Sequence, residues 1–190
     1  MIKDKKVEDR IRQSLATNFE TFADKTASLE QFAKEMTLEN LEYNKDDYLK
    51  YCLYETMRME PPAPVSSSFM MTENLDIGPY KIRAGDMIHT NIQKLHHLED
   101  QWGPDHNEFK PERFADRGKH HPMCFIPFLA GKRVCIGKTF AESTMKVVLP
   151  LIMKAYSGFE FVNKELYHVK HINNTLMKKR PEVMIIMHRD

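Results

Sequence analysis

The chain has 190 residues, of which 42% are hydrophobic, and a nearly balanced charge of 28 basic and 27 acidic residues. This length can bury the core of one ordinary domain, and the balanced charge gives no indication of a nucleic-acid partner or of a strongly acidic one. Three cysteines are too few for a disulfide framework or for a zinc site built from C-x-x-C pairs, which favours a reducing compartment.

The first 45 residues predict helices that carry no recognisable chemistry. Residues 4–23 place hydrophobic side chains at steps of four and three on a charged background, which predicts an amphipathic helix. The members of this stripe are Val7, Ile11, Leu15, Phe19 and Phe22. Ser28 and Gln31 have the spacing of a capping box, so a second, short helix is expected through Met36. The charged start is not a signal peptide, and no window reaches the roughly 18 apolar residues of a membrane span.

A third helix is expected from about Asp46 to Met59. The prolines at 61 and 62 end it. Its buried stripe is predicted to comprise Leu49, Cys52, Leu53, Thr56 and Met57. Glu55 and Arg58 are three residues apart and therefore neighbours on the surface of one turn. Pairs of this kind are common on solvated helices, so alone they indicate no function.

Short β-strands follow this helix. Residues 75–77 and 80–82 flank a Gly78-Pro79 turn, and Ile88, Thr90 and Ile92 alternate after it. This pattern predicts a small antiparallel sheet over residues 75–92.

An irregular loop starting at Trp102 then leads to the segment F-K-P-E-R-F at residues 109–114. Alone, this segment would be interpreted as an exposed loop. The histidine pairs at 96–97 and 120–121 lack the i, i+4 spacing of a helical metal site, and they are predicted to be surface or loop residues.

The segment F-L-A-G-K-R-V-C-I-G, which begins at Phe128, carries the clearest chemistry. Gly131 and Gly137 let the backbone approach a flat group closely. Cys135 stands where the next helix is expected to begin, and free amides there favour a thiolate. Arg133 offers a fork of donors suited to a carboxylate. A thiolate and a guanidinium presented to a flat anionic metal complex predict a haem-binding loop, whereas the alternative is a buried, inert cysteine.

The rest of the chain predicts a helix and a closing strand. A helical stripe after the loop comprises Phe140, Thr144, Val147 and Leu151. After Pro181, the apolar residues 183–187 predict a final strand.

The pattern F-x-x-G-x-R-x-C-x-G resembles the haem-binding signature of the cytochrome P450 family, the haem-thiolate monooxygenases. The E-x-x-R pair and the F-x-P-E-R-F segment resemble two further motifs of that family, in the family's order. The resemblance covers the chain from about residue 46 to its end. It implies an α+β, mainly helical fold that corresponds to the C-terminal portion of the cytochrome P450 domain. The implied divisions are helices preceding the K helix at 1–45, the K helix at 46–60, a β hairpin at 75–92, the PERF segment and haem loop at 109–137, the L helix at 138–157 and a terminal β region at 158–190.

The resemblance also implies roles for single residues. Cys135 would be the axial iron ligand of haem b, and Glu55, Arg58 and Arg113 would form an ion cluster that braces the haem-loop side of the core. The other implied haem-binding residues are Phe128, Gly131, Arg133 and Gly137. A family position that often supplies a propionate-binding arginine falls near Ser67-Ser68, where no basic residue stands.

The implied reaction is insertion of one oxygen atom from O2 into an organic, hydrophobic substrate, with electrons from a reductase partner and no role for nucleic acid. The full-length protein would lie at the cytosolic face of the endoplasmic reticulum membrane. The family's distal acid–threonine pair, in the pattern A/G-G-x-D/E-T, does not occur in the sequence. No catalytic residue is therefore assigned, and the chain by itself is expected not to turn over substrate. The alternatives are a non-catalytic haem-binding remnant and a truncated gene product without the distal half.

Overall fold

The structure is a computed structural model that describes residues 4–42, 46–161 and 185–188. It contains helices and short antiparallel strands, which place the chain in the α+β class. Among the described residues, no helix has the length and apolar content needed to cross a lipid bilayer.

The N-terminal segment contains α1 (Lys5–Asn18), α2 (Glu20–Ala23), α3 (Leu29–Glu35) and α4 (Leu38–Glu42). The single helix predicted over 4–23 is wrong, because the chain is extended at Phe19 (φ −130°, ψ 117°). The Phe19 ring is 2% exposed and meets Phe32 edge-on, with ring centroids 5.6 Å apart. Packing of this ring in the core outweighs the local preference for a continuous helix.

The predicted capping box is confirmed at the start of α3. The Gln31 N–H donates to Ser28 Oγ at 3.1 Å, and the Ser28 N–H donates to the Gln31 side chain at 2.7 Å. The helix ends at Glu35, one residue before the predicted end at Met36.

The helix predicted before the prolines is confirmed as α5 (Tyr48–Met59), and the Glu60 N–H caps it by donating to the Thr56 carbonyl. Of the predicted stripe, Leu49, Cys52 and Met57 are buried, while Leu53 and Thr56 are half-buried. The same face contributes to a core shared with α1 and α3.

Three two-stranded antiparallel ladders occur among the described residues: β1 (Phe69–Met70) with β4 (Met87–Ile88), β2 (Leu75–Ile77) with β3 (Tyr80–Ile82), and β5 (Gly158–Phe161) with β6 (Ile185–His188). The β2–β3 hairpin is as predicted, with Gly78 at φ +56° in its turn. The single sheet predicted over 75–92 is wrong, because Ile88 pairs with Phe69 and Ile92 begins a helix. The predicted closing strand has its described part in β6, and residues 183–184 lie outside the described residues.

Short helical turns connect these strands to the C-terminal helix: α6 (Ile92–Leu95), α7 (Glu99–Trp102), η1 (Pro111–Phe114), η2 (Arg117–Lys119), η3 (Pro122–Cys124) and η4 (Gly131–Arg133). Asn91 begins α6 because its side chain accepts a hydrogen bond from the Lys94 N–H at 2.8 Å. Trp102, Phe114 and Cys124 form a second buried cluster under these turns.

The last helix, α8 (Lys138–Ala155), is buried along its second half only. Pro150 and Met153 are buried, whereas Phe140 is 77% exposed and Thr144 is exposed. Arg12 of α1 anchors the buried end, donating to the Met153 carbonyl at 2.7 Å and the Tyr156 carbonyl at 2.8 Å. The predicted stripe of α8 is therefore packed only toward its C-terminal end.

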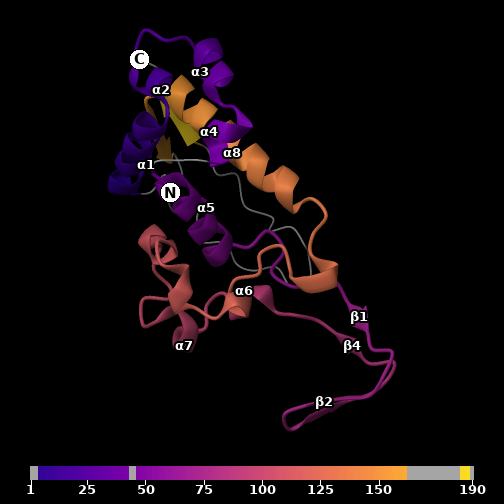
Figure 1. Ribbon diagram of the computed structural model, residues 1–190. Helices are drawn as coiled ribbons and strands as arrows, with labels where there is room; N and C mark the ends of the chain where they lie inside the picture. The colour runs from indigo at the N-terminus through magenta and orange to yellow at the C-terminus, as the bar shows by residue number, and fades with distance from the viewer. Residues whose placement is uncertain (1–3, 43–45, 162–184, 189–190) are drawn as a thin grey trace.

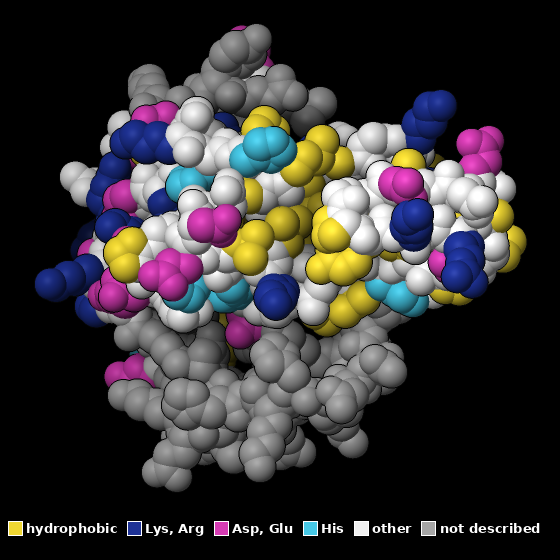
Figure 2. Space-filling view, turned by 90° about the horizontal axis from the view of Figure 1, so that it is seen from below, with side chains coloured by type: hydrophobic (Ala, Val, Ile, Leu, Met, Phe, Trp, Pro, Cys, Tyr) yellow, Lys and Arg dark blue, Asp and Glu magenta, His cyan; other side chains and the backbone are white. Residues whose placement is uncertain are grey.

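Figure 1 shows α1 to α4 gathered around the C-terminal end of α8, with α5 leading away from them toward α6 and α7. The other end of α8 leads into the loop beside β1, and the hairpin of β2 projects beyond it. On the face seen in Figure 2, hydrophobic side chains gather across the centre. The described part of the chain thus has one well-packed end, formed by α1 to α4 and the C-terminal end of α8. The open end comprises the start of α8, the loop before it and the β2–β3 hairpin.

Candidate functional site

The loop between η3 and α8 is held by its own backbone. The Leu129 N–H donates to the Ile126 carbonyl at 3.0 Å across a turn that has Pro127 at its second position. Proline favours that position because its φ is already close to the value that the turn requires. The Cys135 N–H then donates to the Phe128 carbonyl at 2.8 Å, which closes the loop.

Of the two loop glycines, the structure requires left-handed backbone only at Gly131. Gly131 has φ +64°, and no atom lies within 4 Å of the position that a Cβ would occupy. Gly137 has φ −83° and caps α8, and a Cβ there would meet Cys135 Sγ at 3.8 Å. Leu129 also lies in the left-handed region, with φ +61°. The open space at Gly131 would let a ligand approach the backbone closely.

Cys135 is exposed, whereas the other two cysteines, Cys52 and Cys124, are buried. Burial raises the pKa of the Cys52 thiol to about 12, so this group remains protonated and inert. Cys135 lies three residues before Lys138, the first residue of α8, and not at the helix start itself. Its thiol is thus presented on a fixed loop ahead of that helix.

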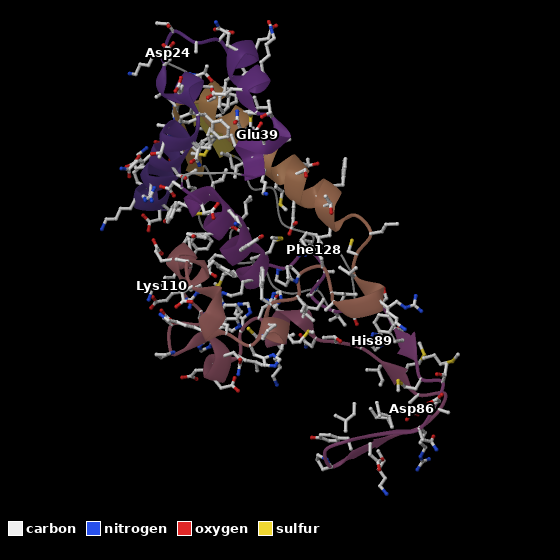
Figure 3. The ribbon with its side chains drawn as sticks, in the orientation of Figure 1. Asp24, Glu39, Asp86, His89, Lys110 and Phe128 are labelled. Carbon is white, nitrogen blue, oxygen red and sulfur yellow. The ribbon has the colours of Figure 1, made fainter. Side chains whose placement is uncertain are left out.

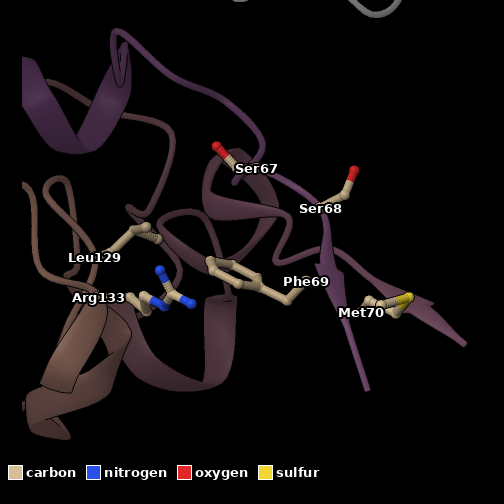
Figure 4. Close-up of a pocket in the computed structure, with 6 residues that line it drawn as sticks. All are labelled: Ser67, Ser68, Phe69, Met70, Leu129 and Arg133. Carbon is tan, nitrogen blue, oxygen red and sulfur yellow. The ribbon is translucent and has the colours of Figure 1, made fainter. Parts of the chain in front are cut away.

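Arg133 borders a hollow of about 490 Å³ beside the loop. The residues that line this hollow are Ser67, Ser68, Phe69, Met70, Leu129 and Arg133. Figure 4 shows the Arg133 guanidinium and the Phe69 ring pointing toward one another, while Ser68 and Met70 project away. Among the described residues that line it, only Arg133 of the loop carries a positive charge.

Phe128 is half-buried and, in the view of Figure 3, lies between the end of α5 and the loop that precedes α8. Its carbonyl is the acceptor for the Cys135 amide. Phe128 therefore contributes to the loop through its backbone.

A buried ion cluster brings together Glu55, Arg58 and Arg113. Arg58 binds both oxygens of the Glu55 carboxylate. Its Nε donates to Oε2 at 2.6 Å, and its Nη2 donates to Oε1 at 2.8 Å. Arg113 Nε donates to Glu55 Oε1 at 3.0 Å. The side chains of Glu55 and Arg58 are 0% exposed and that of Arg113 is 6% exposed, so the pair on α5 is not on the surface.

The donors of this cluster are nearly all used. Arg58 NH1 donates to the His96 carbonyl at 2.9 Å and to the His106 carbonyl at 2.8 Å, and the guanidinium lies over the Trp102 ring. The Lys110 N–H, from the segment labelled in Figure 3, donates to Glu55 Oε1 at 2.9 Å. A buried charge network with these partners ties α5 to η1 and to the chain that precedes η1.

His96 was predicted to be a surface or loop residue; it lies in the turn after α6, but it is not at the surface. His96 is 0% exposed, and its Nε2 accepts a hydrogen bond from the Ile126 N–H at 3.0 Å. His97 is half-buried, as is His120, which stacks on Trp102 with ring centroids 4.6 Å apart. No spacing in the sequence distinguishes His96 from the other histidines, because its burial depends on segments distant along the chain.

Comparison with known proteins identifies the family. The family description "Cytochrome P450" matches residues 1–187. The chain is 35% identical over 144 residues to the bifunctional cytochrome P450/NADPH–P450 reductase 2 of Bacillus subtilis (strain 168), a match that covers 74% of this chain and 13% of that protein. Cytochrome P450 714A2 of Arabidopsis thaliana is 38% identical over 136 residues, covering 70% of this chain and 25% of the relative.

A cytokinin hydroxylase of Arabidopsis thaliana is 34% identical over 139 residues, which cover 73% of this chain and 26% of that protein. The chain thus spans about a quarter, or less, of the length of these relatives. The chain belongs to the cytochrome P450 family. Haem as cofactor and oxidoreductase chemistry are properties of this family.

Proposed function

We propose that this chain forms the cysteine side of the haem site of a cytochrome P450 monooxygenase, with Cys135 as the axial iron ligand. The observation that carries the proposal is the single exposed thiol, held on a loop that the Cys135 N–H closes against the Phe128 carbonyl. In this assignment α5 is the K helix of the family and α8 is the L helix.

The residues present fit a haem. Open space beside Gly131 allows a flat ring to approach the loop, and the guanidinium of Arg133 borders a hollow large enough for a propionate. Ser67 and Ser68 line the same hollow but carry no charge, so Arg133 would bind a propionate from the loop side. A haem bound through a thiolate supplies the chemistry of O–O bond cleavage, because the thiolate increases electron density at the iron.

The protein residues would then orient the cysteine sulfur and hold its loop in place. The closing hydrogen bond from Cys135 to Phe128 fixes the sulfur relative to the loop, and the Glu55–Arg58–Arg113 cluster fixes the chain beneath it. Fixing a ligand in this way lowers the cost of ordering it when the cofactor binds. The substrate would be a hydrophobic organic molecule that receives one oxygen atom, and a reductase would supply the electrons, as the reductase fusion in the B. subtilis relative supports.

The test uses the 190-residue chain reconstituted with haem, reduced and exposed to carbon monoxide. We expect a thiolate-type Soret band that Cys135→Ala abolishes and that Cys124→Ala and Cys52→Ala retain. A thiol reagent should label only Cys135 in the native chain, and added haem should protect it. A thiolate-type band that persists in Cys135→Ala would contradict the assignment.

A second candidate is a haem-binding protein that does not complete turnover by itself. It is favoured by the absence of the acid–threonine pattern from the 190 residues, since that pair would deliver protons to bound oxygen. Supplying haem, a reductase and a panel of hydrophobic substrates to the chain distinguishes the two. Electron consumption without product supports the second candidate, and stoichiometric product contradicts it.

A further inference from the structure

His96 is a buried titratable side chain that touches the segment leading into the Cys135 loop. It caps the C-terminal end of α6, where its N–H donates to the Ile92 carbonyl at 2.9 Å. Its ring packs against Phe125, with centroids 5.2 Å apart. Burial lowers the pKa of His96 to about 4. At neutral pH the imidazole is therefore uncharged.

An uncharged imidazole has one donor and one acceptor nitrogen. Because the Ile126 N–H donates to Nε2 at 3.0 Å, Nε2 is the acceptor and the proton is on Nδ1. Among the described residues Nδ1 has no hydrogen-bond partner, so the ring is held through its hydrogen bond with the Ile126 amide. The ring thus holds the backbone at Ile126.

The connection continues on both sides of His96. On one side, Arg58 NH1 donates to the His96 carbonyl at 2.9 Å, which joins His96 to the ion cluster. On the other side, Ile126 begins the turn in which its carbonyl accepts from Leu129 at 3.0 Å. That turn presents the Phe128 carbonyl to the Cys135 N–H at 2.8 Å. A shift at Ile126 would therefore move the acceptor that closes the loop.

We propose that His96 is a positioning residue for Cys135, which holds the start of the loop by accepting the Ile126 amide and so transmits the rigidity of the ion cluster to the thiol. The consequence for iron ligation rests on the proposed function, whereas the consequence for the loop backbone does not. The alternative is that His96 fills space in the core and affects every part of the fold equally.

The test compares side chains that differ in their reach at this position. Glutamine places its amide oxygen near the position of Nε2, whereas the asparagine oxygen is one methylene short, and leucine fills the space without an acceptor. His97→Leu is the matched control, because His97 is the half-buried neighbour whose ring contacts Gln93 and not the loop.

The first measurement is amide hydrogen exchange of the 190-residue chain without haem. We expect His96→Leu and His96→Asn to accelerate exchange at Ile126 and Cys135 by about tenfold, the loss expected for one buried hydrogen bond. His96→Gln and His97→Leu should retain protection there, and amides of α1 should be unaffected in all variants. Equal behaviour of glutamine and asparagine, equal acceleration in α1, or unfolding of all three His96 variants would overturn the proposal.

The second measurement is the carbon monoxide spectrum of the haem-loaded chain. A lower fraction of the thiolate-type band in His96→Asn, restored in His96→Gln at equal haem content, supports positioning of the ligand. No difference between these two variants contradicts it. If Cys135→Ala retains the band, the proposed function fails while the exchange result at Ile126 still stands, so the two failures are distinguishable.

Discussion

The ion cluster around Glu55 and the loop around Cys135 are linked through His96 and Ile126, yet they are held in opposite ways. In the cluster, side chains bind side chains, and Glu55 and Arg58 are 0% exposed. In the loop, backbone binds backbone, while Cys135 and Ile136 face outward. The described part of the chain therefore satisfies the ion cluster with its own residues and leaves Cys135 and Ile136 exposed.

The difference separates buried residues that stabilise the fold from exposed residues that contribute little to its stability. A buried charge whose partner is removed remains buried and uncompensated, which is costly. An exposed side chain exchanges one contact with water for another, so changing it costs little. Substitutions in the two regions should accordingly differ in free energy of unfolding by several kcal/mol.

The largest effect is expected from Glu55→Ala. It leaves the guanidinium groups of Arg58 and Arg113 buried without their carboxylate, and should lower the free energy of unfolding by about 3–5 kcal/mol. Urea denaturation measures this loss. The control is Glu30→Ala, which removes an exposed pair with Lys34 at 2.8 Å and should change stability by less than about 0.5 kcal/mol. Similar losses in both variants would contradict the contrast.

Lowering the pH should reduce the free energy of unfolding through His96, the residue that adjoins the ion cluster. Its pKa is about 4 in the folded chain, below the ordinary histidine value of 6.5, so the unfolded chain takes up the proton first as the pH falls. The contribution of uncharged His96 to the free energy of unfolding is fully present above pH 6.5 and is lost toward pH 4. The loss is roughly 3 kcal/mol in total, at about 1.4 kcal/mol per pH unit. Unfolding curves of His96→Gln between these pH values should lack this slope. A slope equal to that of the unsubstituted chain would show that other groups cause it.

A smaller effect is expected where α1 anchors the packed end of α8. Arg12→Ala removes donors from the Met153 and Tyr156 carbonyls and should cost about 2 kcal/mol. Lys5→Ala, at a side chain that is 68% exposed, is the comparison and should be nearly neutral. Thermal unfolding followed by circular dichroism tests both, and an equal change in melting temperature would argue against anchoring by Arg12.

The smallest change in stability is expected at the open end. Ile136 is fully exposed, so Ile136→Ser should change the free energy of unfolding by no more than about 0.5 kcal/mol. Removing this apolar side chain, or the 77% exposed Phe140, should reduce self-association measured by light scattering. If Ile136→Ser destabilises the fold as much as Ile11→Ser, whose site is 1% exposed, the open end is not open.

Local patterns in the sequence predicted the elements that short-range contacts build. The Ser28–Gln31 capping box and the proline-terminated helix at 48–59 were predicted correctly, because each depends on residues within one or two turns. The β2–β3 hairpin was predicted for the same reason, since glycine supplies the positive φ of its turn. The haem signature likewise identified the family from residues inside one loop.

Only the tertiary structure decided which side chains are buried, because burial depends on segments that meet from far along the chain. The helix ends at Phe19, whose ring packs on Phe32. His96 is buried where it meets Ile126, 30 residues later, whose N–H donates to its ring. The same helical stripe in α8 is exposed at Phe140 and packed at Val147, because α1 and α3 cover only one end of it. Periodicity specifies a face of a helix, but the free energy of burying that face comes from whatever the rest of the fold places against it.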